Sequence, residues 1–269
     1  MTKKLVRTAV LGAAGRMGQR IIDLILQTEG ISLSAAIEQP GHPLLGKKFE
    51  SKTATLEIRD DLRNVLPEVD VVIDFTTVGS TLSNLAAVAE GKKAVVIGTT
   101  GFSPAETECL REKLHGLRCV VSPNMSIGVN LLFNIVGRVA RMVKEDFDVE
   151  ITEMHHRMKK DAPSGTALRL AEIVAESIEK NLNEVGVYGR KGVVGERKPQ
   201  EIGIHAIRAG DIVGEHTVLF AGKGERIEIT HRAHSRDTFA SGAIKAALWV
   251  VDQAPGIYTM DDVLTRAGG

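Results

Sequence analysis

Residues 153–167 read EMHHRMKKDAPSGTA, so one short segment gathers histidines, lysines, an arginine and a PSGT turn. The imidazoles of His155 and His156 can transfer a proton near neutral pH. Lysine ammonium groups attract anions, and a helix that begins at Pro163 would present unpaired backbone N–H groups to a carboxylate or phosphate. The segment therefore predicts a catalytic site that binds an anion.

A strand is expected just before this segment, because apolar and acidic residues alternate in FDVEI at 147–151. The strand would carry His155 and His156 at its carboxyl end. Adjacent strand residues point to opposite faces, so only one of the two histidines can face a given reacting atom. The same divergence disfavours a metal site made of Glu153, His155 and His156. A lone histidine at a strand end is usually structural or solvated, but the neighbouring cations favour a functional site here.

A second motif, GAAGRMG at residues 12–18, follows an apolar strand and opens a helix. This context is typical of dinucleotide binding. Gly12 permits the tight turn, Ala13 and Ala14 keep side chains away from a pyrophosphate, and the helix from Arg16 directs its N–H groups at the phosphates. The alternative is that the glycines, Gly12, Gly15 and Gly18, serve only the strand-to-helix turn.

The first part of the chain alternates short apolar runs with helical patterns, which is typical of a Rossmann-like parallel sheet. Strands are expected at 5–11, 31–37, 69–75, 92–98 and 117–122, with helices at 16–28, 79–90 and 103–114 and a weaker helix at 60–66.

The pattern changes after Pro123 and predicts a second, α+β domain on a mixed or antiparallel sheet. Helices are expected at 127–144, 164–180 and 237–252, and strands at 202–209, 212–221 and 226–231. These last three strands resemble an antiparallel meander with turns at 210–211 and 222–224. Residues 186–203, rich in Gly, Lys and Arg, are interpreted as a loop.

Composition excludes several classes of protein. In 269 residues, Lys plus Arg and Asp plus Glu both total 34, so a nucleic-acid binder with a general basic field is not expected. Cys109 and Cys119 have neither disulfide density nor metal-ligand spacing, and with no leader-like apolar segment they indicate a reducing cytoplasm. The longest apolar runs are too short to cross a membrane, so a soluble protein is expected.

The stretch EITEMHHRMKKDAPSGTA, at 150–167, resembles the signature of the dihydrodipicolinate reductase family, also named 4-hydroxy-tetrahydrodipicolinate reductases, of lysine and diaminopimelate biosynthesis. The similarity continues through GAAGRMG, VIGTTGF at 96–102, RAGDIVGEHTVLF at 208–220 and the final helix. It covers essentially the whole chain. The resemblance implies a homotetramer in which residues 1–125 and 237–269 bind the dinucleotide and residues 126–236 bind substrate and form the oligomer.

The resemblance also implies the reaction and its residues. A cyclic dicarboxylate would lose its 4-hydroxyl group as water, accept a hydride from NADH or NADPH, and be protonated to tetrahydrodipicolinate. His155 would be the general acid, and Lys159 a second proton donor, an electrostatic stabiliser or a plain anion anchor. Asp161 would orient the turn and cap the helix. The residues that would bind the substrate carboxylates are His156, Lys160, Gly165 and Thr166.

The implied cofactor contacts lie at the ends of several strands, where open α/β sheets bind ligands. They are Gly12, Ala13, Ala14, Gly15, Arg16, Met17, Glu38, Gly98, Thr99, Thr100, Ser122, Pro123, Asn124 and Met125. Without the resemblance, the loops at 98–100 and 122–125 would be interpreted as polar turns.

Glu38 closes the second strand, where an acid typically accepts hydrogen bonds from the adenosine ribose hydroxyls; a surface glutamate is the competing interpretation. Some members of the family carry an arginine at the next position for the 2′-phosphate of NADPH, but this chain has Gln39. Arg16, Lys47 or Lys48 could supply that cation instead, so NADPH remains a candidate.

Two other functions share part of this pattern. Another two-domain NAD(P)-dependent dehydrogenase would have the glycine turn but not HHRMKKDAPSGTA. A non-catalytic dinucleotide sensor would keep GAAGRMG and would not need His155 beside Lys159.

Overall fold

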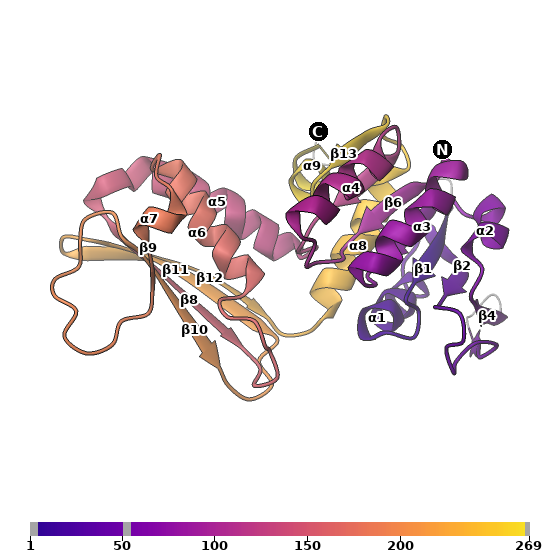
Figure 1. Ribbon diagram of the computed structural model, residues 1–269, viewed down its shortest axis with the longest axis horizontal. Coiled ribbons are helices and arrows are strands. Elements are labelled where there is room, and N and C mark those ends of the chain that lie inside the picture. Colours follow the sequence, from indigo (N-terminus) through magenta and orange to yellow (C-terminus); the bar gives the residue numbers. More distant parts are fainter. Residues whose placement is uncertain (1–4, 51–54, 267–269) are drawn as a thin grey trace. The chain divides into compact units, whose positions relative to one another are not determined.

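The computed structural model describes residues 5–50 and 55–266 of the chain (Figure 1). The chain divides into two compact units. The first comprises Met1–Ile127 and Arg236–Gly269, and the second comprises Gly128–Ser235. The sequence interpretation set the boundaries at 125/126 and 236/237.

The first unit contains an eight-stranded sheet of order β13-β7-β6-β5-β1-β2-β4-β3. Its ladders are parallel except for β3, which pairs antiparallel with β4. The sequence predicted five of these strands correctly: β1 (Val6–Leu11), β2 (Ile31–Ile37), β5 (Val71–Asp74), β6 (Ala94–Ile97) and β7 (Arg118–Val121). It missed the short strands β3 (Lys48–Glu50), β4 (Thr55–Arg59) and β13 (Gly256–Tyr258), of which β3 and β13 form the two edges of the sheet.

Both faces of this sheet are buried, which explains why its strands are continuous apolar runs. Val10, Ile73 and Val96 pack on one face with α1 and α8. The neighbouring residues Val72 and Val95 pack on the other face with α3 and α4. The helices of this unit are α1 (Arg16–Ile25), α2 (Leu62–Val65), α3 (Val78–Glu90), α4 (Pro104–Leu114), α8 (Asp237–Val250) and α9 (Met260–Arg266), with a 3-10 turn at Leu66–Glu68.

The second unit contains a five-stranded sheet of order β12-β11-β8-β10-β9. Its strands are β8 (Asp148–His155), β9 (Gly186–Tyr188), β10 (Ile202–Arg208), β11 (Gly214–Gly222) and β12 (Glu225–Ala233). Its helices are α5 (Ile127–Val143), α6 (Gly165–Ser177) and α7 (Leu182–Val185), with a 3-10 turn at Lys144–Asp146. One core joins residues of α5 and α6 to alternate residues of the strands, such as Ile151, Ile204 and Val218.

Strand β8 brings functional residues to the face that this core covers. Its burial alternates, so that Val149, Ile151, Glu153 and His155 are all buried. The apolar side chains come first along the strand and the ionisable ones last. The expected strand at 147–151 therefore continues to His155, and its core-facing row ends at two polar residues that need partners.

The predicted meander was wrong for β10. This strand pairs parallel with β8 and β9, and β8 separates it from β11. Residues 210–211 therefore do not close a hairpin. Instead, three backbone hydrogen bonds of 2.7–3.1 Å join the end of β8 and the residues after it to the segment that follows β10. The N–H of Ala209 donates to the carbonyl of His155, the N–H of Arg157 to that of Gly210, and the N–H of His156 to that of Ile212. These bonds satisfy backbone groups where β8 and β10 end.

Two other predictions in this unit met different outcomes. Strands β11 and β12 form the expected hairpin around Lys223 and Gly224. Gly224 has a φ of +86°, which suits glycine. Within the segment expected to be a loop, 186–203, the first three residues form β9 and the last two belong to β10, so that only 189–201 of this segment lack regular structure. Among the described residues, no helix is both long and apolar enough to cross a membrane.

Candidate active site

The glycine turn between β1 and α1 requires glycine for close packing. Gly12 has a φ of +66°, a conformation that side chains disfavour. A Cβ atom on Gly18 would lie 2.1 Å from the carbonyl oxygen of Gly12, so α1 starts directly against the turn. The backbone N–H of Gly15 donates to that same oxygen at 2.9 Å. The turn therefore exposes backbone instead of side chains to a ligand.

A pocket of about 1360 Å³, part of it open solvent, lies beside this turn. Gly12, Ala14 and Gly15 line it, together with the ends of β2 and β5 and the first turns of α3. Thr77 caps α3 by accepting a hydrogen bond from the N–H of Ser80. The starts of two helices and a turn of glycine and alanine suit the phosphates of a dinucleotide, and the volume suffices for an elongated ligand.

The acid predicted to face the ribose does line this pocket. Glu38 accepts a hydrogen bond from the N–H of Ala14 at 3.1 Å and one from the N–H of Gln39 at 3.0 Å. Asp60 and His42 also line the pocket. Among its lining residues in the described ranges there is no lysine or arginine.

The remaining residues predicted around the glycine turn lie elsewhere. Ala13 is buried in the core, and Met17 packs against that core. Arg16 is exposed and does not line the pocket. Lys48 lines a different pocket, beside Glu57 and Arg59. The lysine and arginine candidates for binding a 2′-phosphate are therefore absent from the pocket wall.

A buried polar network at the end of β5 was missed by the sequence analysis. Asp74 is 2% exposed and accepts hydrogen bonds from the N–H and Oγ1 of Thr76, at 2.9 and 2.6 Å. Thr81 lies 3.3 Å from Thr76 and 2.9 Å from Thr99, measured between Oγ1 atoms. Burial raises the pKa of Asp74, although these hydrogen bonds oppose the rise. The signal available was the polar pair Thr76 and Thr77 directly after an apolar strand.

The loops at 98–100 and 122–125 do not line this pocket. A Cβ atom on Gly98 would lie 2.3 Å from the ring of Phe75, so this glycine makes room for an aromatic residue that lines the pocket. Ser122 donates to the carbonyl of Asn124 at 2.8 Å, and Met125 is buried in the core. Cofactor binding by these two loops stays a prediction. It concerns Gly98, Thr99, Thr100, Ser122, Pro123, Asn124 and Met125.

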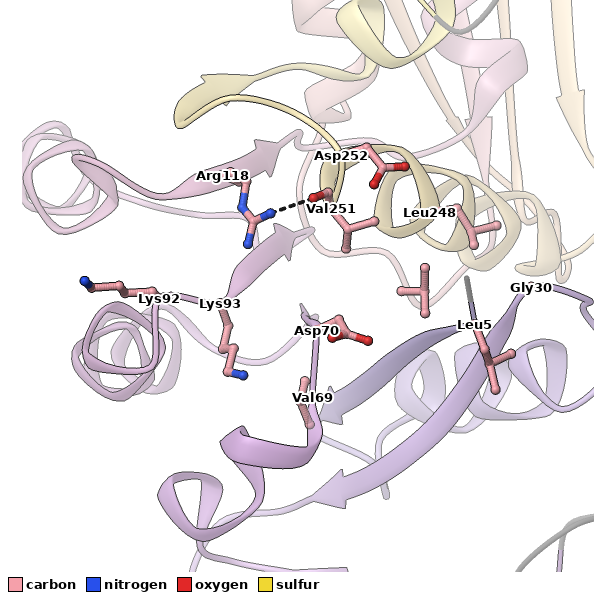
Figure 2. Close-up of a pocket in the computed structure, with 11 residues that line it drawn as sticks. Leu5, Gly30, Val69, Asp70, Lys92, Lys93, Arg118, Leu248, Val251 and Asp252 are labelled. Atoms are coloured by element: carbon pink, nitrogen blue, oxygen red, sulfur yellow. Dashed lines mark hydrogen bonds between the residues drawn. The ribbon is translucent and has the colours of Figure 1, made fainter. Parts of the chain in front are cut away.

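Another pocket in this unit lies at the amino-terminal ends of the parallel strands (Figure 2). Val6 and Arg118, which begin β1 and β7, line it, as do Asp70 and Lys93, which directly precede β5 and β6. Arg118 turns toward the carbonyl of Val251, which accepts its hydrogen bond at 2.6 Å. The glycine turn follows the carboxyl end of β1, so this pocket is separate from the dinucleotide pocket.

In the second unit, His155 ends β8 with its side chain 11% exposed. Its Nδ1 atom lies 2.5 Å from Oε2 of Glu153, which is fully buried. Arg208 of β10 binds both oxygens of Glu153 at 2.9 Å, and the N–H of Ser164 donates to Oε1 at 3.0 Å. These contacts hold the end of β8 beside the start of α6. They also occupy the carboxylate that a metal site would have needed.

The helix that begins within PSGT starts one or two residues later than predicted. Helix α6 begins at Gly165, and Ser164 caps it by accepting a hydrogen bond from the N–H of Ala167 at 3.2 Å. Pro163 therefore precedes the cap, and the expectation that Asp161 caps the helix was wrong. Asp161 pairs instead with Lys159, with 2.9 Å between Oδ2 and Nζ, and its carbonyl accepts from Arg208. A serine oxygen directly at the helix start satisfies the first-turn N–H better than a carboxylate three residues earlier.

The predicted carboxylate-binding residues surround this helix start. Gly165 is exposed, and a Cβ atom there would meet nothing within 4 Å. Thr166 follows it in the first turn, half-buried, and Lys160 is exposed. His156 has a buried Nδ1 atom without a hydrogen-bond partner among the described residues, which a ligand carboxylate could satisfy. Binding of substrate by these residues stays a prediction.

A second buried histidine, His216, completes the cluster. Its Nε2 atom lies 3.1 Å from Oγ of Ser164, and its ring meets that of His155 edge-on, with centroids 5.2 Å apart. Burial lowers the pKa of His216 to about 3. Burial also lowers the pKa of His155, and Glu153 opposes that shift, whereas Lys159 and Arg208 add to it.

Four residues of this cluster were not predicted to act in the site: Glu153, Ser164, Arg208 and His216. Glu153 shares a face of β8 with His155, which its position two residues earlier could have indicated. Arg208 and His216 lie in the RAGDIVGEHTVLF stretch that carried the resemblance. Among the described residues, no group of three or more His, Cys, Asp or Glu side chains is arranged to hold a metal ion.

Comparison with known proteins agrees with both halves of the chain. The family model for the N-terminus of dihydrodipicolinate reductase matches residues 6–125, and the model for its C-terminus matches residues 128–264. A 4-hydroxy-tetrahydrodipicolinate reductase of Syntrophobacter fumaroxidans is 56% identical over 97% of this chain and 99% of its own length. That of Geotalea daltonii is 51% identical over 97% and 99%.

Solved structures agree with the fold. A dipicolinate-bound dihydrodipicolinate reductase from Paenisporosarcina sp. TG-14 matches with a TM-score of 0.73 and 26% identity, over 95% of this chain and 97% of its own. An amine dehydrogenase from Mycobacterium smegmatis matches with a TM-score of 0.58 and 12% identity, over 95% of each chain, and shows the fold alone.

Proposed function

This chain belongs to the dihydrodipicolinate reductase family, and from that membership we propose that it reduces 4-hydroxy-tetrahydrodipicolinate to tetrahydrodipicolinate. The chain is an NAD(P)H-dependent oxidoreductase that acts in lysine biosynthesis. Overall, the substrate loses its 4-hydroxyl group as water and gains one hydride and one proton. The observation that carries the proposal is a buried cluster that holds His155 beside the exposed start of α6.

A bound nicotinamide dinucleotide supplies the hydride, and the pocket beside the glycine turn has the shape for it. The turn at Gly12 and Gly15 leaves backbone for the pyrophosphate, and the start of α1 directs N–H groups at it. Glu38, which holds the turn through the N–H of Ala14, would accept hydrogen bonds from the ribose hydroxyls of the bound cofactor.

His155 is the general acid of this proposal. It is nearly buried, which keeps water from competing for its proton, and its pKa lies below the usual range for histidine. A substrate that brings two carboxylates adds negative charge nearby and raises that pKa again, so binding itself favours the protonated acid. Lys159, paired with Asp161, stabilises the anion or supplies a second proton.

The carboxylates bind at the start of α6 through Gly165 and Thr166, with His156 and Lys160 as further donors. The exposure of Gly165 and the unsatisfied Nδ1 atom of His156 support this assignment. Dipicolinate, a planar dicarboxylate, is bound to the Paenisporosarcina reductase. The same class of ligand suits this cluster.

NADH is used at least as well as NADPH in this proposal. The carboxylates of Glu38 and Asp60 line the pocket, and they would repel a 2′-phosphate where no described lining lysine or arginine offsets them. On the family resemblance we also propose a homotetramer in the cytoplasm, whose mass light scattering can measure.

The test is a coupled assay in which dihydrodipicolinate synthase generates the substrate while oxidation of NADH is followed. Oxidation that requires the synthase and its substrates supports the proposal. Dinucleotide binding without any oxidation would indicate a sensor. Oxidation with other carbonyl substrates, but not with this one, would indicate a different two-domain dehydrogenase.

A further inference from the structure

Glu153 is a buried carboxylate that contacts three residues, of which only Ser164 belongs to the start of α6. Oε2 lies 2.5 Å from Nδ1 of His155 and 2.9 Å from Nη1 of Arg208, while Oε1 accepts from Nη2 of Arg208 at 2.9 Å and from the N–H of Ser164 at 3.0 Å. Burial raises the pKa of Glu153, but hydrogen bonds from Arg208, His155 and Ser164 outweigh it and lower that pKa overall. The carboxylate therefore stays ionised.

An ionised carboxylate can only accept hydrogen bonds, so the contact with His155 requires a proton on Nδ1. The other ring nitrogen, Nε2, is then the atom that gains and loses a proton. Within residues 5–50 and 55–266, the hydrogen bond of the His155 ring is made by Nδ1, and Nε2 makes none. Gly214 lies beside it, and a Cβ atom there would come within 3.0 Å of Nε2. Glycine at position 214 thus keeps the space next to Nε2 free.

The groups around His155 come from several elements. Glu153 lies on β8, Arg208 ends β10, His216 lies on β11 and Lys159 follows β8. Glu153 is the one anion in this set, and the two cations disfavour a charged imidazole. The orientation of His155 and its readiness to hold a proton therefore both depend on Glu153.

We propose that Glu153 is a positioning residue for the reaction: its carboxylate fixes the Nδ1–H tautomer and the ring orientation of His155, so that Nε2 faces the substrate. The same carboxylate holds the N–H of Ser164, and so aligns the start of α6 with the proton donor. This inference rests on the proposed function, because it takes His155 as the acid.

A purely structural role for Glu153 makes different predictions. If Glu153 served only to neutralise Arg208 and to join β8 to α6, its replacement would destabilise the second unit but leave the tautomer and the pKa of His155 as they are. The tautomer of His155 can be measured independently of the stability of the second unit, so it separates the two roles.

The experiment is long-range ¹H–¹⁵N NMR of the full chain labelled with ¹⁵N-histidine. The chain has 8 histidines, and the signals that disappear in His155→Gln identify His155. In the wild-type protein above its pKa, we expect a protonated Nδ1 and an unprotonated Nε2. A protonated Nε2 would overturn the proposal, and this measurement needs no variant to fold.

Glu153→Gln is the informative variant, because its amide cannot attract the imidazole proton as a carboxylate does. We expect a further fall in the pKa of His155, a mixed tautomer, and a loss of kcat of about tenfold or more that exceeds any change in KM. Glu150→Gln is the matched control, since Glu150 is also a β8 carboxylate paired with arginines but does not contact the His155 cluster. It should leave the His155 spectrum unchanged.

The outcomes separate this inference from the proposed function. If Glu153→Gln folds and leaves the tautomer and pKa of His155 unchanged, the positioning role is wrong even where the reductase activity stands. If His155→Gln retains wild-type turnover, the assignment of the acid fails, and a positioning role in catalysis fails with it, whatever the tautomer.

Discussion

The backbone N–H of Ala14 donates a hydrogen bond to Oε2 of Glu38 at 3.1 Å, which ties the glycine turn to the acid at the end of β2. Both residues line the same pocket. The turn that suits a pyrophosphate and the carboxylate that suits a ribose are thus held as one unit before any ligand arrives. Preorganisation of this kind reduces the ordering that binding requires.

The first prediction concerns the choice of cofactor. Glu38 and Asp60 place negative charge in the pocket, and Gln39 offers a 2′-phosphate no charge. We therefore expect kcat/KM with NADH to equal or exceed that with NADPH at matched ionic strength. A preference for NADPH of about tenfold or more would show that Arg16 or the lysines at 47 and 48 reach the phosphate after all.

Gln39→Arg should raise kcat/KM for NADPH, because a guanidinium pairs with phosphate in a bidentate manner. The NADH value should change little. Gln39→Ala, which removes the amide without adding a charge, is the control and should leave the ratio of the two values near that of the wild type.

Local patterns in the sequence were sufficient to predict the five central strands of the first unit and the helices α1, α3 and α4 between them. Strands such as Val71–Asp74 are buried on both faces, so they appear as short apolar runs between helices with clear periodicity. Those signals are local. The three-residue strands β3 and β13 are too short to show such a pattern.

The second unit was harder to predict because its arrangement depends on residues far apart in the sequence. Nothing in residues 202–208 indicates that β10 lies next to β8 instead of β11. The Glu153–Arg208 pair spans 55 positions, and His155 was predicted without either partner. Likewise, either Asp161 or Ser164 of the DAPSG turn could have capped α6, and only the three-dimensional contacts identify Ser164.

The second prediction tests the proton donor. His155→Gln should lower kcat by about a hundredfold or more, within the usual range for a positioned general acid, with dinucleotide affinity nearly unchanged. His205→Gln is a suitable control, because His205 lies on β10 and pairs with Glu150, outside the cluster. Turnover within a few fold of wild type in His155→Gln would refute the role of His155.

The third prediction follows from the lowered pKa of His155, whose first cause is burial. A general acid must start protonated, so kcat/KM should be constant at low pH and fall as pH rises through this pKa, below about 6.5. In the substrate complex the two carboxylates raise that pKa, so kcat should begin to fall at a higher pH than kcat/KM. Coincident profiles would mean that substrate does not change the charge state of His155.

The fourth prediction concerns the two carboxylates of the substrate. Pyridine-2,6-dicarboxylate should inhibit competitively with the substrate, because the start of α6 and the nearby side chains offer more donors than one carboxylate can use. Pyridine-2-carboxylate should bind about tenfold more weakly or worse, the loss of one charged hydrogen-bonded contact. Equal inhibition constants would indicate a single anion site.

The last prediction links the buried His216 to acid stability. Burial lowers its pKa to about 3 in the folded protein, whereas in the unfolded chain it is about 6.5. Between these values the unfolded chain binds the extra proton, so the stability that His216 contributes is present above pH 6.5 and lost as pH falls toward about 3. The loss from this residue is about 1.4 kcal/mol per pH unit.

The comparison that isolates this effect uses His216→Gln, which cannot take up a proton but can still bond to Ser164. Its unfolding free energy, measured by denaturant titration from pH 7.5 to pH 4, should decline less steeply than that of the wild type. The exposed His234, changed to Gln in the same way, should give the wild-type slope. If all three slopes agree, the imidazole of His216 is already protonated or solvated in the folded protein, and its proposed place in a dry cluster with Ser164 and His155 is wrong.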